Sequence, residues 1–429
     1  MIGNFKDLAI TSLRQAALEI AEAGLMAIAT PAAIRRLVFL KDDILRIDGQ
    51  NYDLTKIGKI LFVGIGKCAL EAGLELEEVL NGRLDEGIIV DVHQPKFKIQ
   101  NSKFEIFVGT HPFPSEQNID ITKKIIGLLS GLTEKDLVIF AISGGGSTLL
   151  CQPQDMTCYN EADLLKVLFE KGATIQEINT VRKHLSLARG GYLAKYLYPA
   201  KGAVLIFADV PGDNFEFVAS GPTVKDTTTV TEAAVIVQKY DVEKICGFSC
   251  NLIETPKDDI YFENICNILA VSNKTALVAM AAKADDLGFK VEIKTAVLSG
   301  EAKDVGREIA EDLNTIDGKA VLLYGGETTV TVKKPGRGGR NQELALAALP
   351  ILKAGELVLV LASDGRDNGE YAGAIVDLET NKKAEALNLS SAEFLENNQS
   401  TDFFEKTGDF LMTGDTGSNV SDLVIAIKN

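Results

Sequence analysis

Residues 59–69 read KILFVGIGKCA, an apolar run that carries two glycines and a lysine toward its end. Its first part, residues 59–65, is nearly continuous and does not alternate with polar residues, which is typical of a strand covered on both faces of a parallel sheet. Similar runs occupy residues 87–92, 137–142 and 203–208, and segments of helical periodicity separate them. This alternation predicts an α/β fold in which crossover helices connect parallel strands.

The alternation is interrupted after residue 208 by a polar segment, a helix around 229–240 and an irregular stretch at 246–259. A second alternation follows and ends in a strand at 423–427. Its other expected elements are a helix at 341–349 and strands near Ile268, Val291, Val321, Val330 and Leu357. The pattern therefore predicts two successive α/β segments.

The length of 429 residues is too great for one ordinary core, so we expect two domains. The first, over residues 1–245, is an α/β domain with a parallel sheet, and the second, over residues 260–429, is a smaller α/β domain. Residues 1–40 could pack on either lobe.

The composition excludes several classes of partner. The formal net charge is −16, whereas nucleic acids and anionic membranes are bound by clustered Lys and Arg. The N-terminus has the pattern of an amphipathic helix and not of a signal peptide, and no apolar run approaches the ~20 residues that span a bilayer. The six cysteines form no CxxC pair and lack neighbouring histidines, which favours idle thiols in a reducing, cytoplasmic compartment over a zinc site.

Two glycine loops follow expected strands, at the edge where parallel sheets bind ligands. Gly64, Gly66 and Lys67 form the first, which matches neither a Walker A loop nor a GxGxxG fingerprint, so a plain tight turn is the alternative. The second loop, in AISGGGSTLL, consists of Ser143, Gly144, Gly145, Gly146 and Ser147. Three consecutive glycines cost backbone entropy without a gain in packing, which indicates close approach of a ligand to bare amides; a passive loop is the alternative.

The segment FADVPGDNFEFVASGPT follows the expected strand at 203–208. It places Asp209 at the end of that strand and Asp213 four residues later, with Ser220 and Gly221 beyond. A carboxylate next to phosphate-binding glycines suits a general base or a magnesium ligand, and capping of a turn is the alternative.

The segment GGETTVTVKKPGRGGRNQELALAAL concentrates basic residues in an acidic chain. Arg337 and Arg340 stand among glycines, and Arg340 and Asn341 open a helix. Cationic side chains at the positive end of a helix favour a bound anion. A loop arginine beside glycines contributes little packing, so we expect removal of Arg340 to leave the fold intact.

Two further segments are ASDGRDNGEYAGA, with Asp364 and Asp367, and MTGDTGSNVSDL, with Asn419. Phosphoryl transfer needs cationic groups and amides that neutralise the transferring group, and a carboxylate that positions the attacking hydroxyl. Acidic groups in one set of loops and basic groups in another therefore predict a small-molecule kinase.

These segments, in this order, resemble the glycerate kinase family often called the MOFRL family, whose members make 2-phosphoglycerate. The resemblance runs from about Val63 to Val424, essentially the whole chain. It is carried by VGIGKCA, THPFPSEQN, SGGGSTLL, EINTVRKHLSLARGGYLA, DVPGDNFEFVASGPT, GGETTVTVKKPGRGGRNQELALA, SDGRDNGEYAGAIVD and TGDTGSNVSDL. Any one of these motifs could arise by chance, but the ordered set is specific.

The resemblance implies a Rossmann-like N-terminal domain, a smaller C-terminal MOFRL domain and a cleft between them, with ATP, Mg²⁺ and D-glycerate as ligands. It makes Lys67 and Arg340 a charge-neutralising pair. It turns Asp209 and Glu327 toward the site and adds Asp364 and Asn419 from the C-terminal loops. We expect Asp209 or Asp364 to orient or deprotonate the reacting hydroxyl. The full expected set is Lys67, Arg340, Asp209 and Asp364 for catalysis, Asp209 and Asp213 for the metal, and Gly64, Gly66, Ser143–Ser147, Ser220, Gly221, Glu327, Asn341 and Asn419 for the cofactor. Arg182, Lys183 and His184 match a further motif, which would otherwise be an ordinary basic helix face.

One loop departs from the family pattern. Ser363 stands before Asp364 where threonine is usual, and Asn368 stands after Asp367 where a glycine is usual. This departure leaves open a catalytically weakened nucleotide-binding homologue. A hydroxypyruvate reductase is the other alternative, although it would need a nicotinamide fingerprint that the sequence lacks. The oligomeric state is open, with a homodimer as one option.

Overall fold

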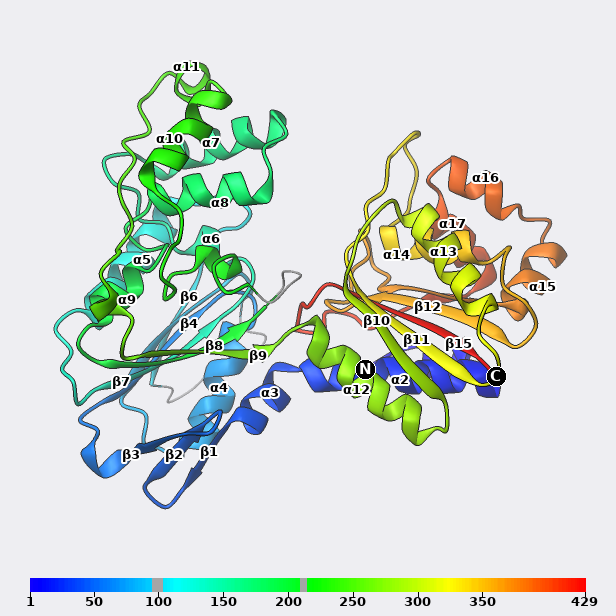
Figure 1. Ribbon diagram of the computed structural model, residues 1–429, viewed down its shortest axis with the longest axis horizontal. Coiled ribbons are helices and arrows are strands. Elements are labelled where there is room, and N and C mark those ends of the chain that lie inside the picture. The colour runs from blue at the N-terminus through cyan, green and yellow to red at the C-terminus, as the bar shows by residue number, and fades with distance from the viewer. Residues whose placement is uncertain (95–102, 209–213) are drawn as a thin grey trace. The chain divides into compact units, whose positions relative to one another are not determined.

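The computed structural model describes residues 1–94, 103–208 and 214–429, which divide into two compact units. The N-terminal unit comprises residues 33–208 and 214–270. The C-terminal unit comprises Val271–Asn429 together with Met1–Ala32, so both ends of the chain build it. The mixed α/β fold class expected from the sequence is confirmed (Figure 1).

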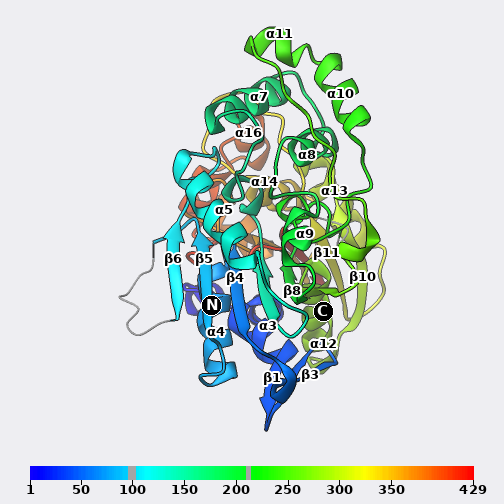
Figure 2. The ribbon, with the colours of Figure 1, turned by 90° about the vertical axis from the view of Figure 1, so that its left-hand side faces the viewer.

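A six-stranded sheet forms the centre of the N-terminal unit. Its strands are β4 (Ile60–Ile65), β5 (Glu86–Asp91), β6 (Phe104–Val108), β7 (Leu137–Ile142), β8 (Lys201–Phe207) and β9 (Ile265–Val271), in the order β6-β5-β4-β7-β8-β9. The first five in this order run parallel, and Figure 2 shows β6, β5 and β4 side by side. The order is that of a Rossmann sheet, in which ligands bind where the order reverses, here between β4 and β7.

Buried apolar residues explain why these strands lie at the centre. Every residue of β4 and β7 is buried, and the two strands pair in register from Ile60 opposite Leu137 to Ile65 opposite Ile142. The four apolar runs predicted from the sequence become β4, β5, β7 and β8 with ends shifted by at most two residues. A small antiparallel sheet of β1 (Val38–Lys41), β2 (Ile44–Ile47) and β3 (Gln50–Asp53) belongs to the same unit.

The helices of the N-terminal unit form two groups. The first group comprises α3 (Thr30–Leu37), η1 (Leu54–Lys56), α4 (Ala69–Leu80), α5 (Glu116–Leu129), α6 (Gly146–Leu149), α9 (Tyr192–Leu197), η2 (Val218–Ser220) and η3 (Asp259–Tyr261). Of these, α4 packs on β4, β5 and β7, and α9 packs on β8. The second group packs around its own apolar cluster, beyond α6 in Figure 1: α7 (Cys158–Glu170), α8 (Ile175–His184), α10 (Val230–Lys239) and α11 (Val242–Cys246). Capping boxes at Thr157, Thr174 and Thr229 fix where α7, α8 and α10 begin.

The C-terminal unit is built on a mixed six-stranded sheet. Its strands are β10 (Lys290–Leu298), β11 (Ala320–Gly326), β12 (Glu356–Ala362), β13 (Gly373–Asp377), β14 (Phe410–Leu411) and β15 (Asp422–Lys428), in the order β10-β11-β15-β12-β13-β14. Only β10 and β11 pair in parallel among these strands. Its helices are α1 (Phe5–Leu8), α2 (Ser12–Ile28), α12 (Asn273–Asp286), α13 (Ala302–Asn314), α14 (Arg340–Ala348), α15 (Leu378–Ala386), α16 (Ser391–Glu396) and α17 (Ser400–Thr407).

The strand expected near Val330 is wrong. Residues 327–334 contain only an isolated bridge between Glu301 and Thr329. Side chains replace a neighbouring strand as partners of the backbone there, because Thr331 N donates to Glu301 Oε1 at 3.0 Å and Lys333 N donates to Asn398 Oδ1 at 2.8 Å. An alternating sequence thus satisfies its backbone without joining the sheet.

A buried ion-pair network holds the start of the chain in the C-terminal unit. Arg14 of α2 is fully buried and donates to both carboxylate oxygens of Asp377 at 2.8 and 2.6 Å and to Asp409 at 2.7 Å. Removing one partner would leave a buried charge uncompensated, so this network specifies where α2 packs. No single helix in the described part of the chain is long and apolar enough to cross a bilayer, although α2 and α3 meet that criterion as a pair bent by 60°.

Candidate functional site

The loops that follow β4 and β7 touch each other at the carboxyl ends of these strands. Lys67 N donates to Gly144 O at 3.1 Å, and Cys68 N donates to Ser143 Oγ at 3.2 Å. The two loops therefore form one structure, which we call the glycine cradle: Gly64–Lys67 and Ser143–Ser147. It lies where the strand order reverses, the position at which such sheets bind ligands.

Gly66 is required at the centre of the cradle. Its φ is +113°, and a Cβ there would stand 2.7 Å from Ser143 O and 2.8 Å from Gly144 O. Gly145 also has a positive φ of +85°, and it precedes the short helix α6. The glycines thus allow both a conformation and a close approach that side chains would prevent.

The Gly66→Ala variant is expected to be destabilised by about 2–4 kcal/mol and to lose activity. The added Cβ would overlap with the backbone of the second loop, and alanine would also be strained at this positive φ. Gly82→Ala is the matched control, since Gly82 has a φ of +83° but open space around it. We expect that control to cost only about 1 kcal/mol. Urea unfolding measures both, and equal losses would show that the close packing of the cradle contributes nothing.

Three basic side chains gather at the cradle. Lys67 has no ion-pair partner among the residues that the structure describes. Arg182 of α8 donates from Nη2 to Thr148 Oγ1 at 3.2 Å, directly after the second loop. The ring of His111 lies against Gly145, with Cδ2 3.6 Å from the place that a Cβ would take. Burial, and then the charge of Arg189, lower the pKa of Arg182 to about 10, which leaves it cationic at neutral pH.

Arg182 was not among the residues expected to bind ligand, and only one side chain of its motif faces the loops. Lys183 is buried against Asp226 at 2.5 Å, and His184 is buried with Nδ1 2.9 Å from Ile253 O. These two residues hold the helical group together. What distinguishes Arg182 from its two neighbours is the face of α8 on which it lies. The sequence does not show which face of the helix packs against the loops.

The serines of two predicted segments also meet. Ser147 Oγ lies 2.8 Å from Ser220 Oγ, which donates in turn to Asn179 Oδ1 at 3.0 Å. Ala219, Ser220 and Gly221 all adopt positive φ, of 53°, 58° and 59°. For Ala219 and Ser220 this conformation is strained, and such strain persists only where surrounding structure holds it and often marks functional sites. The catalytic and metal-binding aspartates expected in the same segment, Asp209 and Asp213, lie outside the described residues.

At the start of α14 an internal carboxylate takes the place of the expected anion. Asp367 accepts from Asn341 N at 3.1 Å and from Gln342 N at 2.8 Å, and so caps the helix from a distant loop. The carboxylate is buried, and this burial raises the pKa of Asp367 to about 6 despite those two bonds. The positive end of the helix is therefore already neutralised by the chain itself.

This raised pKa predicts a pH dependence of stability. Because the folded state holds a proton up to pH ~6 that the unfolded chain releases near pH ~4, the contribution of Asp367 to stability falls as pH rises through that window. Relative to Asp367→Asn, the free energy of unfolding of the natural protein is expected to increase by about 1 kcal/mol for each unit that the pH is lowered from ~6 to ~4. Paired urea titrations measure this difference, and a pH-independent difference would contradict the assignment.

Arg340 forms the centre of a second polar cluster, in the C-terminal unit. It donates to Asp422 through Nε at 2.5 Å and through Nη2 at 3.0 Å, and Nη2 lies 3.2 Å from Glu327. Burial opposes the charge of Arg340, but these carboxylates hold its pKa above the usual value. Asn341 Nδ2 also donates to Asp422, at 2.9 Å. The predicted residues Arg340 and Asn341 thus both bind Asp422, which sequence reasoning did not single out, and the predicted Glu327 pairs with Arg340.

The loops that carry Asp364 and Asn419 lie at the same edge of this sheet. Thr416 N donates to Asp364 O at 3.3 Å, and the charge of Asp364 contributes to raising the pKa of Asp422, for which burial is the main cause. Both predicted side chains make local turns, since Asp364 Oδ1 accepts from Arg366 N at 3.0 Å and Asn419 Oδ1 accepts from Ser421 N at 3.1 Å.

The unusual residues of the Asp364 loop fit its geometry. Asn368 has a φ of +56°, a conformation that asparagine tolerates better than other residues with side chains. Its Nδ2 donates to Gly338 O at 2.9 Å. Ser363 Oγ accepts from Val420 N at 2.8 Å, which ties the loop to the segment before β15. The substitutions therefore keep the loop ordered.

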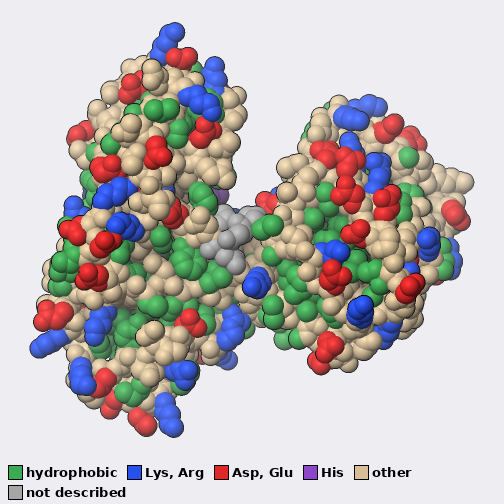
Figure 3. All heavy atoms as spheres, viewed as in Figure 1, with side chains coloured by type: hydrophobic (Ala, Val, Ile, Leu, Met, Phe, Trp, Pro, Cys, Tyr) green, Lys and Arg blue, Asp and Glu red, His purple; other side chains and the backbone are tan. Residues whose placement is uncertain are grey.

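The described residues do not contain a preformed metal site. No group of three or more His, Cys, Asp or Glu side chains within 1–94, 103–208 and 214–429 is arranged to hold a metal ion. All six cysteines are free thiols. On the face shown in Figure 3, Lys and Arg are interspersed with Asp and Glu over both units and do not form the basic tract that nucleic acid would require.

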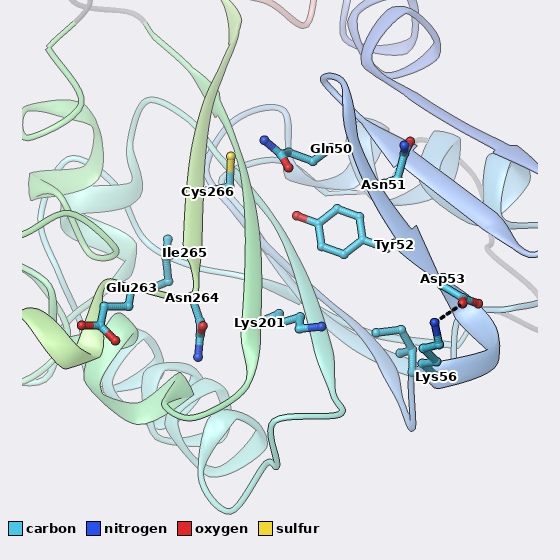
Figure 4. A pocket seen from close by; sticks show the side chains of 11 residues that line it. Gln50, Asn51, Tyr52, Asp53, Lys56, Lys201, Glu263, Asn264, Ile265 and Cys266 are labelled. Atoms are coloured by element: carbon cyan, nitrogen blue, oxygen red, sulfur yellow. Dashed lines mark ion pairs between the residues drawn. The ribbon is translucent and has the colours of Figure 1, made fainter.

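A cavity of about 480 Å³ lies elsewhere in the N-terminal unit. Figure 4 shows Tyr52 of β3 pointing into it across from Cys266 of β9, with Lys201 at the start of β8 below. Lys56 is paired with Asp53 at 2.9 Å. Because Lys201 opens its strand, this cavity lies at the amino ends of the strands, opposite the edge that carries the glycine cradle.

Comparison with known proteins identifies relatives over nearly the whole chain. The family described as a domain of unknown function, DUF4147, matches residues 16–249, and the MOFRL family matches residues 320–422. A glycerate 2-kinase of Pyrococcus horikoshii is 37% identical over 416 residues, covering 92% of each chain. A protein of Agrobacterium vitis provisionally named hydroxypyruvate reductase is 36% identical over 382 residues, covering 85% of this chain and 86% of that one.

A solved structure agrees with these sequence relatives. The crystal structure of glycerate kinase from Thermotoga maritima superposes with a TM-score of 0.86 at 32% identity, covering 97% of this chain and all of that one. The resemblance seen in the ordered motifs is thereby confirmed. The chain belongs to the MOFRL family of glycerate kinases.

Proposed function

We propose that this protein transfers the γ-phosphoryl group of ATP to the 2-hydroxyl of D-glycerate, giving 2-phosphoglycerate and ADP. The observation that carries the proposal is the glycine cradle, in which two interlocked glycine loops and two cations, Lys67 and Arg182, meet at the ligand-binding edge of a Rossmann sheet. The overall charge of −16 repels anions from most of the protein surface. An anionic ligand would therefore bind where positive charge is locally concentrated, as it is at the cradle.

Each residue group contributes a separate part of the reaction. The amides of Gly144 and Gly145 and the ammonium of Lys67 hold the phosphates and neutralise charge that spreads over the phosphoryl oxygens in the transition state. The amide of Gly146 is excluded because it donates to Ser143 O at 3.3 Å. Arg340 supplies a second cation for that charge, while Glu327, Asn341 and Asn419 orient the ligands around it. Asp209 or Asp364 accepts the hydrogen of the attacking hydroxyl and aligns its oxygen in line with the γ-phosphate.

Magnesium is proposed to bind through Asp209 and Asp213, since carboxylates are its preferred protein ligands. The described residues offer no alternative set of three acidic or imidazole ligands. When bound, the ion would neutralise phosphate charge at the cradle. We further propose that the protein acts in the cytoplasm, where its six free thiols would remain reduced.

The direct test is a steady-state assay of the purified protein with D-glycerate, ATP and Mg²⁺, with the product identified by phosphorus NMR. We expect glycerate-dependent ADP formation and the resonance of 2-phosphoglycerate. Absence of ADP above background would refute the kinase assignment, and formation of 3-phosphoglycerate would refute the regiochemistry.

The name carried by the Agrobacterium vitis relative makes hydroxypyruvate reduction a second candidate. A Rossmann sheet order is compatible with a dinucleotide, but the loop after β4 lacks the GxGxxG pattern that brings a pyrophosphate onto the helix. Loss of the nicotinamide absorbance band on mixing hydroxypyruvate, NADH or NADPH and protein would favour the reductase. A catalytically weakened homologue would instead bind ATP without glycerate-dependent turnover.

A further inference from the structure

His111 lies beside the cradle in a motif, THPFPSEQN, to which the proposed reaction assigns no role. Its loop is held in place by the buried side chain of Asn118. Asn118 Oδ1 accepts from Thr110 N at 2.9 Å, and Nδ2 donates to the carbonyls of Thr110 and Thr148 at 3.0 Å each. Thr148 Oγ1 in turn donates to Pro112 O at 3.2 Å. The backbone on both sides of His111 is thus held in place, and its exposed imidazole lies against the glycine loop at Gly145.

The charged groups that face His111 are almost all positive. Lys67 approaches from the loop after β4, Arg182 from α8, and His93 from the segment after β5. The loop Ser143–Ser147 brings no titratable group. Two described acids lie beside these cations and not at His111 itself. Asp91 lies 3.6 Å from His93 Nδ1 and accepts from His93 N at 3.0 Å, and Glu161 Oε1 lies 3.9 Å from Arg182 Nε. No carboxylate among the described residues is placed to compensate the charge of a proton on His111 when the cradle holds no anion.

We propose that His111 is the proton-coupled ligand of the cradle: it is neutral in the free protein and takes up a proton from solvent when an anion enters, to which it then donates a hydrogen bond. The inference rests on the proposed function, because the anion in question is the polyphosphate of the nucleotide.

The electrostatics support this coupling and give its sign. Burial, followed by the charges of Lys67, Arg182 and His93, holds the pKa of His111 below its usual value. A polyphosphate at hydrogen-bond distance would reverse the local field and raise that pKa, by roughly 1–3 units for an opposite charge within ~4–6 Å. The proton therefore strengthens anion binding below the pKa of the free protein, and this gain is lost as pH rises through the pKa of the complex.

The test is an NMR titration of the imidazole C–H signals of the full-length protein with and without a non-hydrolysable ATP analogue. The chain contains only three histidines, so His93→Gln and His111→Gln assign the signals. We expect the midpoint of His111 to rise by about one pH unit or more on binding. His184, which is buried and bonded to Ile253 O and Thr228 Oγ1, is the internal control and should not respond.

Calorimetry with the same analogue separates the possible failures. The affinity of the natural protein should weaken more between pH ~6 and ~8 than that of His111→Gln, whose fold is checked by circular dichroism. Binding of the analogue without a rise in the His111 midpoint would overturn the inference and leave the proposed function standing. Absence of binding would overturn both.

Discussion

The Lys67→Met variant is expected to keep its fold and to lose on the order of 10² to 10³ in kcat, the cost of removing one preorganised group that stabilises transition-state charge. The fold should survive because Lys67 has no ion-pair partner among the described residues, so no charge is left uncompensated. Methionine retains most of the length of the side chain and removes only the ammonium group. Steady-state kinetics with D-glycerate and ATP, together with thermal unfolding, measure the two effects.

Lys201→Met provides the matched control. Lys201 is an exposed lysine of the same unit at the opposite end of the sheet, where it lines the cavity beside Tyr52. The same chemical change there should alter the rate by no more than about twofold, because an exposed charge distant from the site is screened. Comparable losses in the two variants would attribute the effect of Lys67 to net charge and not to the cradle.

The Arg340→Ala variant is expected to lose activity by a similar factor and, unlike Lys67→Met, to lose stability as well. Its removal leaves the carboxylate of Asp422, whose side chain is only 4% exposed, without its cation. Breaking a fully buried pair costs about 3–5 kcal/mol, and we expect about 1–3 kcal/mol here because the guanidinium is partly exposed. Urea unfolding measures the loss.

A double variant separates the two roles of Arg340. Arg340→Ala with Asp422→Asn removes the uncompensated charge, so stability should recover while turnover stays low. If Arg340→Ala alone unfolds at the same urea concentration as the natural protein, the ion pair with Asp422 contributes nothing to the fold. Recovery of turnover in the double variant would contradict a role for the guanidinium in catalysis.

The sequence predicted the central strands well because their burial leaves a local signature. Runs such as that of β4 are apolar at every position, so no knowledge of neighbouring chain is needed to identify them. The segment near Val330 has the same composition as a strand, but its backbone partners are the side chains of Glu301 and Asn398. That choice depends on residues distant in sequence, and no local pattern records it.

The candidate site likewise combines features that a local sequence pattern indicates with features that depend on residues distant in sequence. Consecutive glycines signalled the cradle because glycine is costly unless the backbone needs it. Asp422 was not singled out, because it is a single acid at the start of an apolar strand and its importance comes from its contact with Arg340 of α14. Asp367 was named, but its role as the cap of α14 could not be foreseen because that contact joins segments distant in sequence. For Arg340 the structure changes what we expect: its partner Asp422 is 4% exposed, which sequence alone does not show, so we now expect removal of the guanidinium to cost stability.

The most direct measurement is a crystal structure of the protein with a non-hydrolysable ATP analogue and D-glycerate. We expect the analogue's phosphates to accept hydrogen bonds of about 3 Å from the amides of Gly144 and Gly145 and from Lys67 Nζ. A triphosphate bound elsewhere, for instance in the cavity beside Tyr52 and Lys201, with only solvent at the glycine cradle, would contradict it.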